Sequence, residues 1–165
     1  WNLLGCGGGK VYDARVTINA EEYSPVDPDT MIPTGHAKVA GTVFDLRTPT
    51  RLGDRISENF GGYDHNFLLR GTPVEVCDGT SLALAATVED GGMRMTVLTD
   101  QPCVQFYMAN GLRGKTPFKG GVRQDVHTAY CFETQTEPDG PNRGEAILHP
   151  DGVYRHTSFY RIEKI

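Results

Sequence analysis

The chain has 165 residues, of which 38% are hydrophobic, and it carries a formal net charge of -5 without any block of like charges. This length and composition are typical of one domain with a real core. The acidic balance gives no basic surface, so neither nucleic acid nor an anionic membrane surface is an expected partner. No run of residues resembles a membrane span.

The cysteines are scattered: Cys6, Cys77, Cys103 and Cys131 form no Cys-x-x-Cys pair, and no histidines stand near them at ligand spacing. The pattern therefore predicts neither a metal site nor a redox motif. No Asn-x-Ser/Thr glycosylation acceptor occurs either. We expect a reduced compartment, and we predict a cytoplasmic location.

Glycine and proline, with 20 and 10 residues, are spread along the whole chain. Glycine and proline residues spread in this way are typical of many short strands and turns. We therefore expect an all-β, antiparallel protein without long helices. In Val11–Ala20, apolar and polar side chains alternate, which predicts a strand with one buried face. Only Leu52–Glu58 is predicted as a short helix.

The clearest local signal is a β-hairpin. Leu82–Glu89 and Met93–Thr99 are two strand-like runs, and Asp90-Gly91-Gly92 between them tolerates the positive φ of a tight turn. Near the end of the chain, Tyr154–Ile162 alternates and predicts another strand. The sequence shows no repeat, low-complexity tract or linker, so we expect a single domain.

Three predicted strands each carry one isolated polar group that folding alone does not require. Asp64 lies in an apolar run from Gly62 to Leu69, Gln105 lies between Val104 and Phe106, and Glu133 follows Phe132. A strand built for stability would place Val, Ile or Thr on its covered face, because a buried carboxylate is costly unless it is paired. Polar groups on several strands are typical of a polar-ligand site on a β-scaffold.

Each of these residues also has a purely structural interpretation. An isolated buried glutamate such as Glu133 is more often a structural residue paired with an arginine, and Gln105 alone is also explained by a satisfied core amide. His65 follows Asp64 and points to the opposite face, where we expect a structural histidine that is hydrogen-bonded to backbone. The other histidines stand singly without ligand spacing, and we expect them on the surface or in loops: His36, His127, His149 and His156.

Many segments, in order along the chain, match the motifs of one known family: Trp1–Leu3, Tyr23–Asp27, Ile32–Gly35, Gly41–Arg47, Asp64–Phe67, Gln101–Asn110, Glu133–Gln135, Pro138-Asp139, Asn142, Leu148 and Tyr154–Thr157. They resemble the aldose 1-epimerases, or galactose mutarotases. The resemblance implies a large antiparallel β-sandwich of the galactose-mutarotase type. It also implies an enzyme that interconverts the α- and β-anomers of free hexoses such as galactose and glucose.

The resemblance also implies roles for the polar groups. Glu133 would be the general base that removes the proton from the anomeric hydroxyl, and a partly dry cleft would raise its pKa. Asp64 and Gln105 would bind the vicinal hydroxyls of the sugar, because the first offers acceptors and the second offers both donors and acceptors. No cofactor is expected, since the reaction is paired proton transfer. Cys103 stands where the family usually has glycine.

The family's general-acid histidine would lie three residues before Trp1, outside this chain. We therefore expect residues 1–165 to be the C-terminal portion of a single aldose 1-epimerase domain, with the N-terminal half as its expected partner. Alone, the chain would expose strand edges and lack activity, unless another residue, first of all His127, serves as the acid. Two alternatives are a hexose-6-phosphate epimerase, which should show clustered Arg or Lys, and a non-catalytic sugar-binding or regulatory relative.

Overall fold

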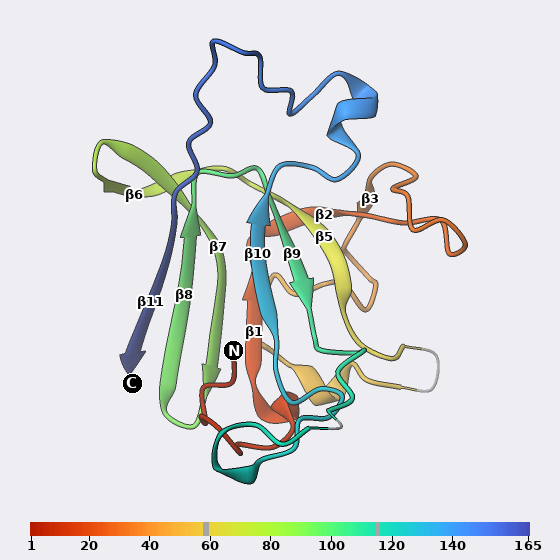
Figure 1. Cartoon of the computed structure of the whole chain (residues 1–165), viewed down its shortest axis with the longest axis vertical. Helices are drawn as coiled ribbons and strands as arrows, with labels where there is room; N and C mark the ends of the chain where they lie inside the picture. Colours follow the sequence, from red (N-terminus) through yellow and green to blue (C-terminus); the bar gives the residue numbers. More distant parts are fainter. Residues whose placement is uncertain (58–59, 115) are drawn as a thin grey trace.

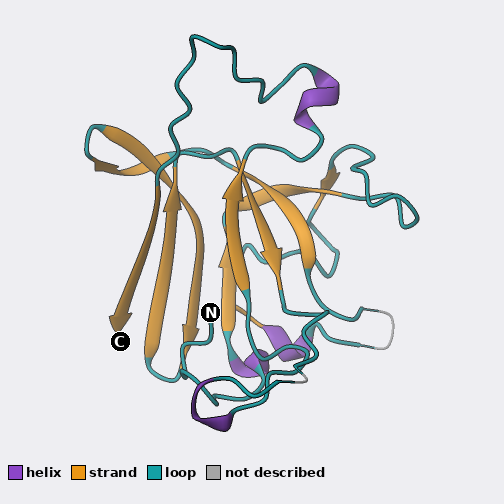
Figure 2. Cartoon of the chain, in the orientation of Figure 1, coloured by secondary structure: helices purple, strands orange, loops and turns teal. Residues whose placement is uncertain are grey.

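The protein is a sandwich of two antiparallel β-sheets (Figures 1 and 2), seen in a computed structural model that describes residues 1–57, 60–114 and 116–165. The first sheet has the strand order β11-β8-β7-β1-β4, and β6 also pairs with β7. Its strands are β1 (Arg15–Ile18), β4 (Thr50–Arg51), β6 (Pro73–Cys77), β7 (Thr80–Asp90), β8 (Met93–Thr99) and β11 (Ser158–Lys164).

The second sheet has the order β10-β9-β5-β2-β3. Its strands are β2 (Ala20–Ser24), β3 (Ala37–Lys38), β5 (Asp64–Leu69), β9 (Cys103–Tyr107) and β10 (Cys131–Gln135). The helical segments of the described chain are short 3-10 turns: η1 (Val11–Asp13), η2 (Leu52–Asp54), η3 (Lys119–Gly121) and η4 (Gly140–Arg143). The predicted all-β antiparallel sandwich is confirmed.

The core lies between the inner faces of the two sheets. The first sheet contributes aliphatic side chains from β1, β7 and β8, and the second contributes a layer of aromatic ones. Phe106 of β9 is fully buried, stacks on Phe132 at 4.9 Å between ring centroids and contacts Tyr63 at 5.0 Å. Because inward and outward side chains alternate, this packing turns the intervening residues of β9 and β10 to the outer face.

Val11–Ala20 has the predicted buried face but is not one strand. It begins with η1 and passes from the first sheet to the second at Asn19. The Asn19 amide group donates to Leu84, its backbone N–H donates to Ala85, and its carbonyl accepts from Arg70. Alternation persists through this crossing because β1 and β2 both face the same core, so periodicity cannot reveal the change of sheet.

The predicted hairpin is confirmed: Asp90 pairs with Met93, and Gly91 and Gly92 have φ of 56° and 73°. The predicted helix in Leu52–Glu58 was wrong in length, because η2 has three residues and Glu58 lies outside the described residues. The strand predicted from Tyr154 starts only at Ser158. Just before this strand, the backbone N–H of Thr157 donates a hydrogen bond to the Asp100 carboxylate.

None of the helices in the described part of the chain is long and apolar enough to cross a membrane.

The aromatic layer predicts a strong dependence of stability on Phe106. Replacing it by alanine should lower the free energy of unfolding by about 3–5 kcal/mol, because a fully buried ring is lost and a cavity remains. Phe159, which is 38% exposed, is the matched control. Its alanine variant should cost less than about 1 kcal/mol. Urea denaturation of both variants measures the difference, and equal losses would contradict the proposed position of the core.

Candidate functional site

A row of polar side chains crosses the outer face of the second sheet. Glu133 on β10 is paired with Gln105 on β9, Gln105 with Asn66 on β5, and Asn66 with Ser24 on β2. Directly paired residues in antiparallel strands point to the same face. Four neighbouring strands therefore present one polar side chain each, side by side, on the face opposite the core.

Asp64 joins this row through a hydrogen bond. It lies two residues before Asn66 on β5 and so shares its face, and the Gln105 side-chain amide donates to its Oδ1 at 2.8 Å. Glu133, Gln105 and Asp64, the three residues singled out in the sequence, thus lie on one surface. The bond uses one N–H of Gln105 and leaves the second Asp64 oxygen and the Gln105 carbonyl oxygen as acceptors toward solvent.

The structural alternative for Glu133 is not what the structure shows. Its side chain is exposed, and among the described residues it has no ion pair with an arginine. In this chain Glu133 is exposed and β10 is an edge strand, so the partly dry surroundings expected of the whole site are not formed by this chain alone. The Cys131 thiol has a pKa raised first by burial and further by the nearby carboxylates of Glu133 and Asp64.

Asn66 is the buried centre of the site and was missed in the sequence. It is 3% exposed, its amide donates to Ser24 Oγ at 3.0 Å, and its Oδ1 accepts from Gln135 Nε2 at 3.1 Å. Gln135 lies two residues after Glu133, so this bond passes over β9 and ties β10 to β5. The available signal was the spacing: Asn66 and Gln135 each stand two positions from a predicted site residue.

A small cavity of about 130 Å³ opens on this face. Its polar side is formed by Ser24, Asp64, Asn66 and Gln105, and its other wall is apolar and comes from loops: Val26, Met31, Pro33 and Pro138. Acceptor oxygens on one side and apolar groups on the other suit a ligand with both hydroxyl groups and C–H surface. Glu133 is not part of the lining and lies next to the cavity, as the neighbour of Gln105.

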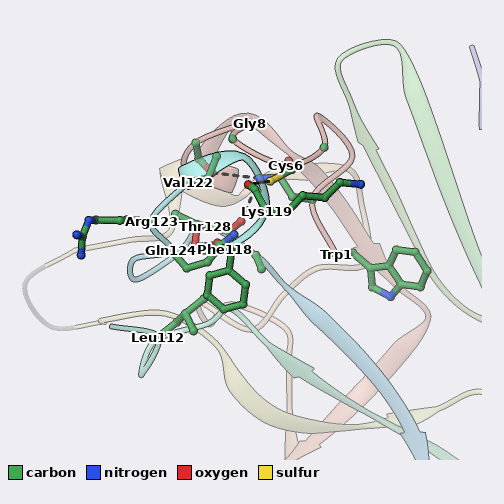
Figure 3. Close-up of a pocket in the computed structure, with 15 residues that line it drawn as sticks. Trp1, Cys6, Gly8, Leu112, Phe118, Lys119, Val122, Arg123, Gln124 and Thr128 are labelled. Atoms are coloured by element: carbon green, nitrogen blue, oxygen red, sulfur yellow. Dashed lines mark hydrogen bonds between the residues drawn. The ribbon is translucent and has the colours of Figure 1, made fainter. Parts of the chain in front are cut away.

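A larger cavity of about 560 Å³ lies away from these residues (Figure 3). It lies between the glycine-rich loop after Trp1 and the segment around Phe118 and Val122, where the Cys6 thiol donates to the Lys119 carbonyl at 3.3 Å. None of the three predicted site residues lines it. Size alone therefore does not identify the candidate site.

His65 has the predicted structural position. It points away from Asp64 toward the aromatic rings of Phe44 and Phe60, and its Nδ1 accepts the backbone N–H of Asp64 at 2.9 Å. Burial lowers the pKa of its imidazole, and the charge of Asp64 opposes this shift. A neutral His65 thus fixes the backbone at the residue that carries the Asp64 carboxylate.

His127 lies in a loop, as expected, but it is 7% exposed and is not a surface residue. Its Nδ1 is bonded to the Tyr12 hydroxyl at 2.8 Å and its Nε2 to the Gly61 carbonyl at 2.7 Å. Both nitrogens are engaged, so His127 is unsuited to act as an acid in the cleft. His36 is hydrogen-bonded to Glu137 at 2.7 Å, and His156 is hydrogen-bonded to Thr134 at 2.9 Å.

Cys103 is 2% exposed and borders the polar row between Gln135 and Leu68. Burial raises the pKa of its thiol, while a hydrogen bond from Asn66 opposes the shift. The Cys103 side chain therefore occupies space beside the Asn66 amide that a glycine would leave empty. Within the described residues, no cluster of three or more His, Cys, Asp or Glu side chains has the geometry to hold a metal ion.

Comparison with known proteins places the chain in one family. A sequence model described as aldose 1-epimerase matches residues 1–161. The chain therefore belongs to the aldose 1-epimerase family.

Individual relatives agree. The chain is 40% identical to the galactose mutarotase of Pongo abelii over 98% of its own length and 47% of the relative. It is 38% identical to the Homo sapiens galactose mutarotase, and 34% identical to the aldose 1-epimerase of Escherichia coli K12 over 92% of its length and 45% of the relative. The chain thus spans about half the length of the curated relatives it matches.

Solved structures show the same fold. A galactose 1-epimerase from Lactobacillus acidophilus superposes with a TM-score of 0.70 at 26% identity, covering 95% of this chain and 46% of that one. An aldose epimerase homologue from C. elegans gives 0.72 at 18% identity, covering 94% of this chain and 47% of that one. The predicted sandwich of galactose-mutarotase type is confirmed over this chain.

Burial of His65 predicts a pH dependence of stability. Its folded-state pKa lies below the ordinary value of about 6.5, so the unfolded chain binds a proton more readily. The free energy of unfolding should therefore fall as the pH drops below about 6.5, and this contribution should be fully present above that value. NMR titration of the ring should give a midpoint below about 6.5.

Urea denaturation of a His65→Gln variant tests the link to stability. Its loss of stability between pH 7 and pH 5 should be smaller than that of the unmodified chain, whereas both should respond alike between pH 7.5 and 8.5. A His65 midpoint above 6.5 would contradict the prediction.

Proposed function

We propose that this chain supplies the general base and part of the sugar-binding surface of an aldose 1-epimerase, which interconverts the α- and β-anomers of free hexoses. One observation carries the proposal: Glu133 is paired with Gln105, and Gln105 is bonded to Asp64, on one open face. Membership of the aldose 1-epimerase family supports it. The names of the relatives favour galactose as the first substrate to test.

In this proposal, Glu133 carries out proton transfer, whereas Asp64 and Gln105 bind the sugar. Glu133 would take the proton of the anomeric hydroxyl while an acid protonates the ring oxygen, and the bond between C1 and the ring oxygen breaks to give the open-chain aldehyde. Rotation about C1–C2 and reversal of both proton transfers give the other anomer. Asp64 and Gln105 would accept and donate hydrogen bonds to the remaining hydroxyls and hold the sugar against the apolar wall.

These two transfers need only a base and an acid, so the proposal includes no cofactor. The acid would come from the N-terminal half of the same protein, which we propose as the partner of this chain, with the monosaccharide as substrate. The four cysteines have no disulfide in the structure, which supports the proposed cytoplasmic location.

The alternatives have less support. A hexose-6-phosphate epimerase needs cationic groups around the site, yet none of the residues lining the 130 Å³ cavity is Arg or Lys. The nearby Arg143 is engaged with Glu137 at 3.5 Å and Glu145 at 3.3 Å. A non-catalytic sugar-binding protein would use Asp64 and Gln105 in the same way, so only turnover separates it from the enzyme.

The decisive change is Glu133→Gln in the protein that includes the N-terminal half. The amide keeps the shape of the side chain and loses the base, so turnover should fall by roughly 10²-fold or more while sugar binding stays within a few-fold. Polarimetry on fresh α-D-galactose measures the rate of mutarotation, and chemical-shift titration measures binding.

The matched control is Glu75→Gln on β6, where Glu75 is ion-paired with Arg161 of β11 in the first sheet, whereas the row lies on the second sheet. It should leave both rate and binding unchanged. Unchanged turnover in Glu133→Gln would assign the base elsewhere. Sugar binding without any turnover in the unmodified protein would establish the binding protein instead.

A further inference from the structure

The buried histidine His127 has no part in the proposed chemistry, yet it contacts the ends of three strands of the site. It is 7% exposed and precedes β10, which carries Glu133. Its backbone N–H donates to the Ala109 carbonyl at 3.2 Å, just after β9, and its Nε2 lies 2.7 Å from the Gly61 carbonyl, just before β5. In Figure 1 the start of β5, the end of β9 and the start of β10 all lie at the lower end of the second sheet.

The partners of the His127 ring assign the position of its proton. A carbonyl oxygen only accepts hydrogen bonds, so Nε2 carries the proton and donates it to the Gly61 carbonyl. Nδ1 of the neutral ring is then an acceptor, and the Tyr12 hydroxyl donates to it at 2.8 Å. Tyr12 therefore selects the tautomer, and the ring orientation, that can bond to Gly61.

The bond to Gly61 matters because the entry to β5 is intrinsically loose. Gly61 and Gly62 are consecutive glycines, which have wide backbone freedom, and Gly62 has a φ of 122°. Tyr63 follows them, and Asp64 is the first residue of β5. Without an anchor, rotation at the two glycines would move the end of the strand that carries the Asp64 carboxylate.

Two side-chain hydrogen bonds hold this pair of glycines from both sides. His127 bonds to the Gly61 carbonyl, and the Asn110 amide donates to the Tyr63 carbonyl at 2.9 Å. Between these bonds Gly62 has no room for a side chain, because a Cβ there would lie 2.3 Å from Asn110 Oδ1 and 3.0 Å from His127 Nε2. The two side chains therefore enclose the backbone at Gly62 and fix its path into β5.

The backbone of His127 is itself held in an uncommon conformation. Its φ is 58°, in the left-handed region that few residues other than glycine adopt. Its N–H is bonded to Ala109, and its carbonyl accepts the Val11 N–H at 2.9 Å. Such conformations persist where the surrounding structure imposes them. Here the imposed conformation directs the ring at Gly61.

We propose that His127 is a positioning residue of the candidate site: its Nε2–H bond to Gly61 fixes the entry of β5 and thereby the place of the Asp64 carboxylate. Asp64 in turn accepts the Gln105 amide at 2.8 Å. The use of Asp64 and Gln105 to bind a sugar rests on the proposed function. The anchoring itself rests on hydrogen bonds and can be tested without a sugar.

Three variants separate this role from a backbone role and from a packing role. His127→Gln keeps the N–H donor, because its amide nitrogen is the same number of bonds from Cα as the histidine Nε2. His127→Asn adopts a positive φ readily and keeps a polar atom in place of Nδ1, but it does not reach Gly61. His127→Leu keeps apolar bulk without a donor. A backbone role predicts that asparagine suffices, and a packing role predicts that leucine does.

Hydrogen exchange measured by mass spectrometry tests the anchoring in the protein that includes the N-terminal half. Amides of residues 61–66 should exchange at least tenfold faster in His127→Asn and His127→Leu, because the entry of β5 opens locally. His127→Gln should stay within about threefold of the unmodified protein. The hairpin of β7 and β8 is the internal reference, and its unchanged exchange would separate local opening from a general loss of stability.

Steady-state kinetics with galactose measure the consequence for the site. The KM should rise about tenfold in His127→Asn and His127→Leu, the effect of one lost hydrogen bond, while kcat stays within about threefold because Glu133 keeps its place on β10. His127→Gln should restore most of the affinity. The matched control is His149→Asn, the same change at an exposed histidine, which should leave exchange and kinetics unchanged.

A retained β5 entry in His127→Asn or His127→Leu overturns the proposal, and so does equal opening in all three variants. If a variant does not fold, the unmodified protein supplies the test. A long-range ¹H–¹⁵N NMR spectrum should show a proton on Nε2 of His127, and a ring without that proton overturns the proposal. Because exchange and tautomer are measured without turnover, failure here is distinct from failure of the Glu133→Gln experiment.

Discussion

Strand β9 pairs with β5 on one side and with β10 on the other, and the register of these two pairings determines the site. They align Asn66, Gln105 and Glu133 in one row. A slip of one residue in either pairing would turn a whole strand over, because side chains alternate with a period of two. The aromatic core resists such a slip, since Phe106 and Phe132 would then leave their stacked positions for water.

The polar groups on the outer face differ in how deeply they are buried. Asn66 is buried and has partners on both sides, so the loss of either would leave an unsatisfied amide at a cost of about 1–3 kcal/mol. Asp64 and Glu133 are exposed, so their charges keep most of their hydration. The candidate site thus combines a buried amide with two exposed carboxylates.

The sequence predicted the parts of the structure that depend on alternation and turn chemistry. The hairpin at Gly91-Gly92 and the inward and outward faces of β5, β9 and β10 follow from patterns within a few residues. The change of sheet at Asn19 could not be predicted, because alternation is the same on both sides of it. Neither could the bond between Asn66 and Gln135, which joins residues 69 positions apart through the strand order.

The exposure of Glu133 in this chain also differs from what the sequence predicted. Its cause is again not local in the sequence. Whether a strand is central or at an edge depends on which other strands exist beside it, and no local pattern in Cys131–Gln135 records that. In the structure, two reciprocal backbone bonds between Trp1 and Tyr130 lie on the side of β10 opposite β9.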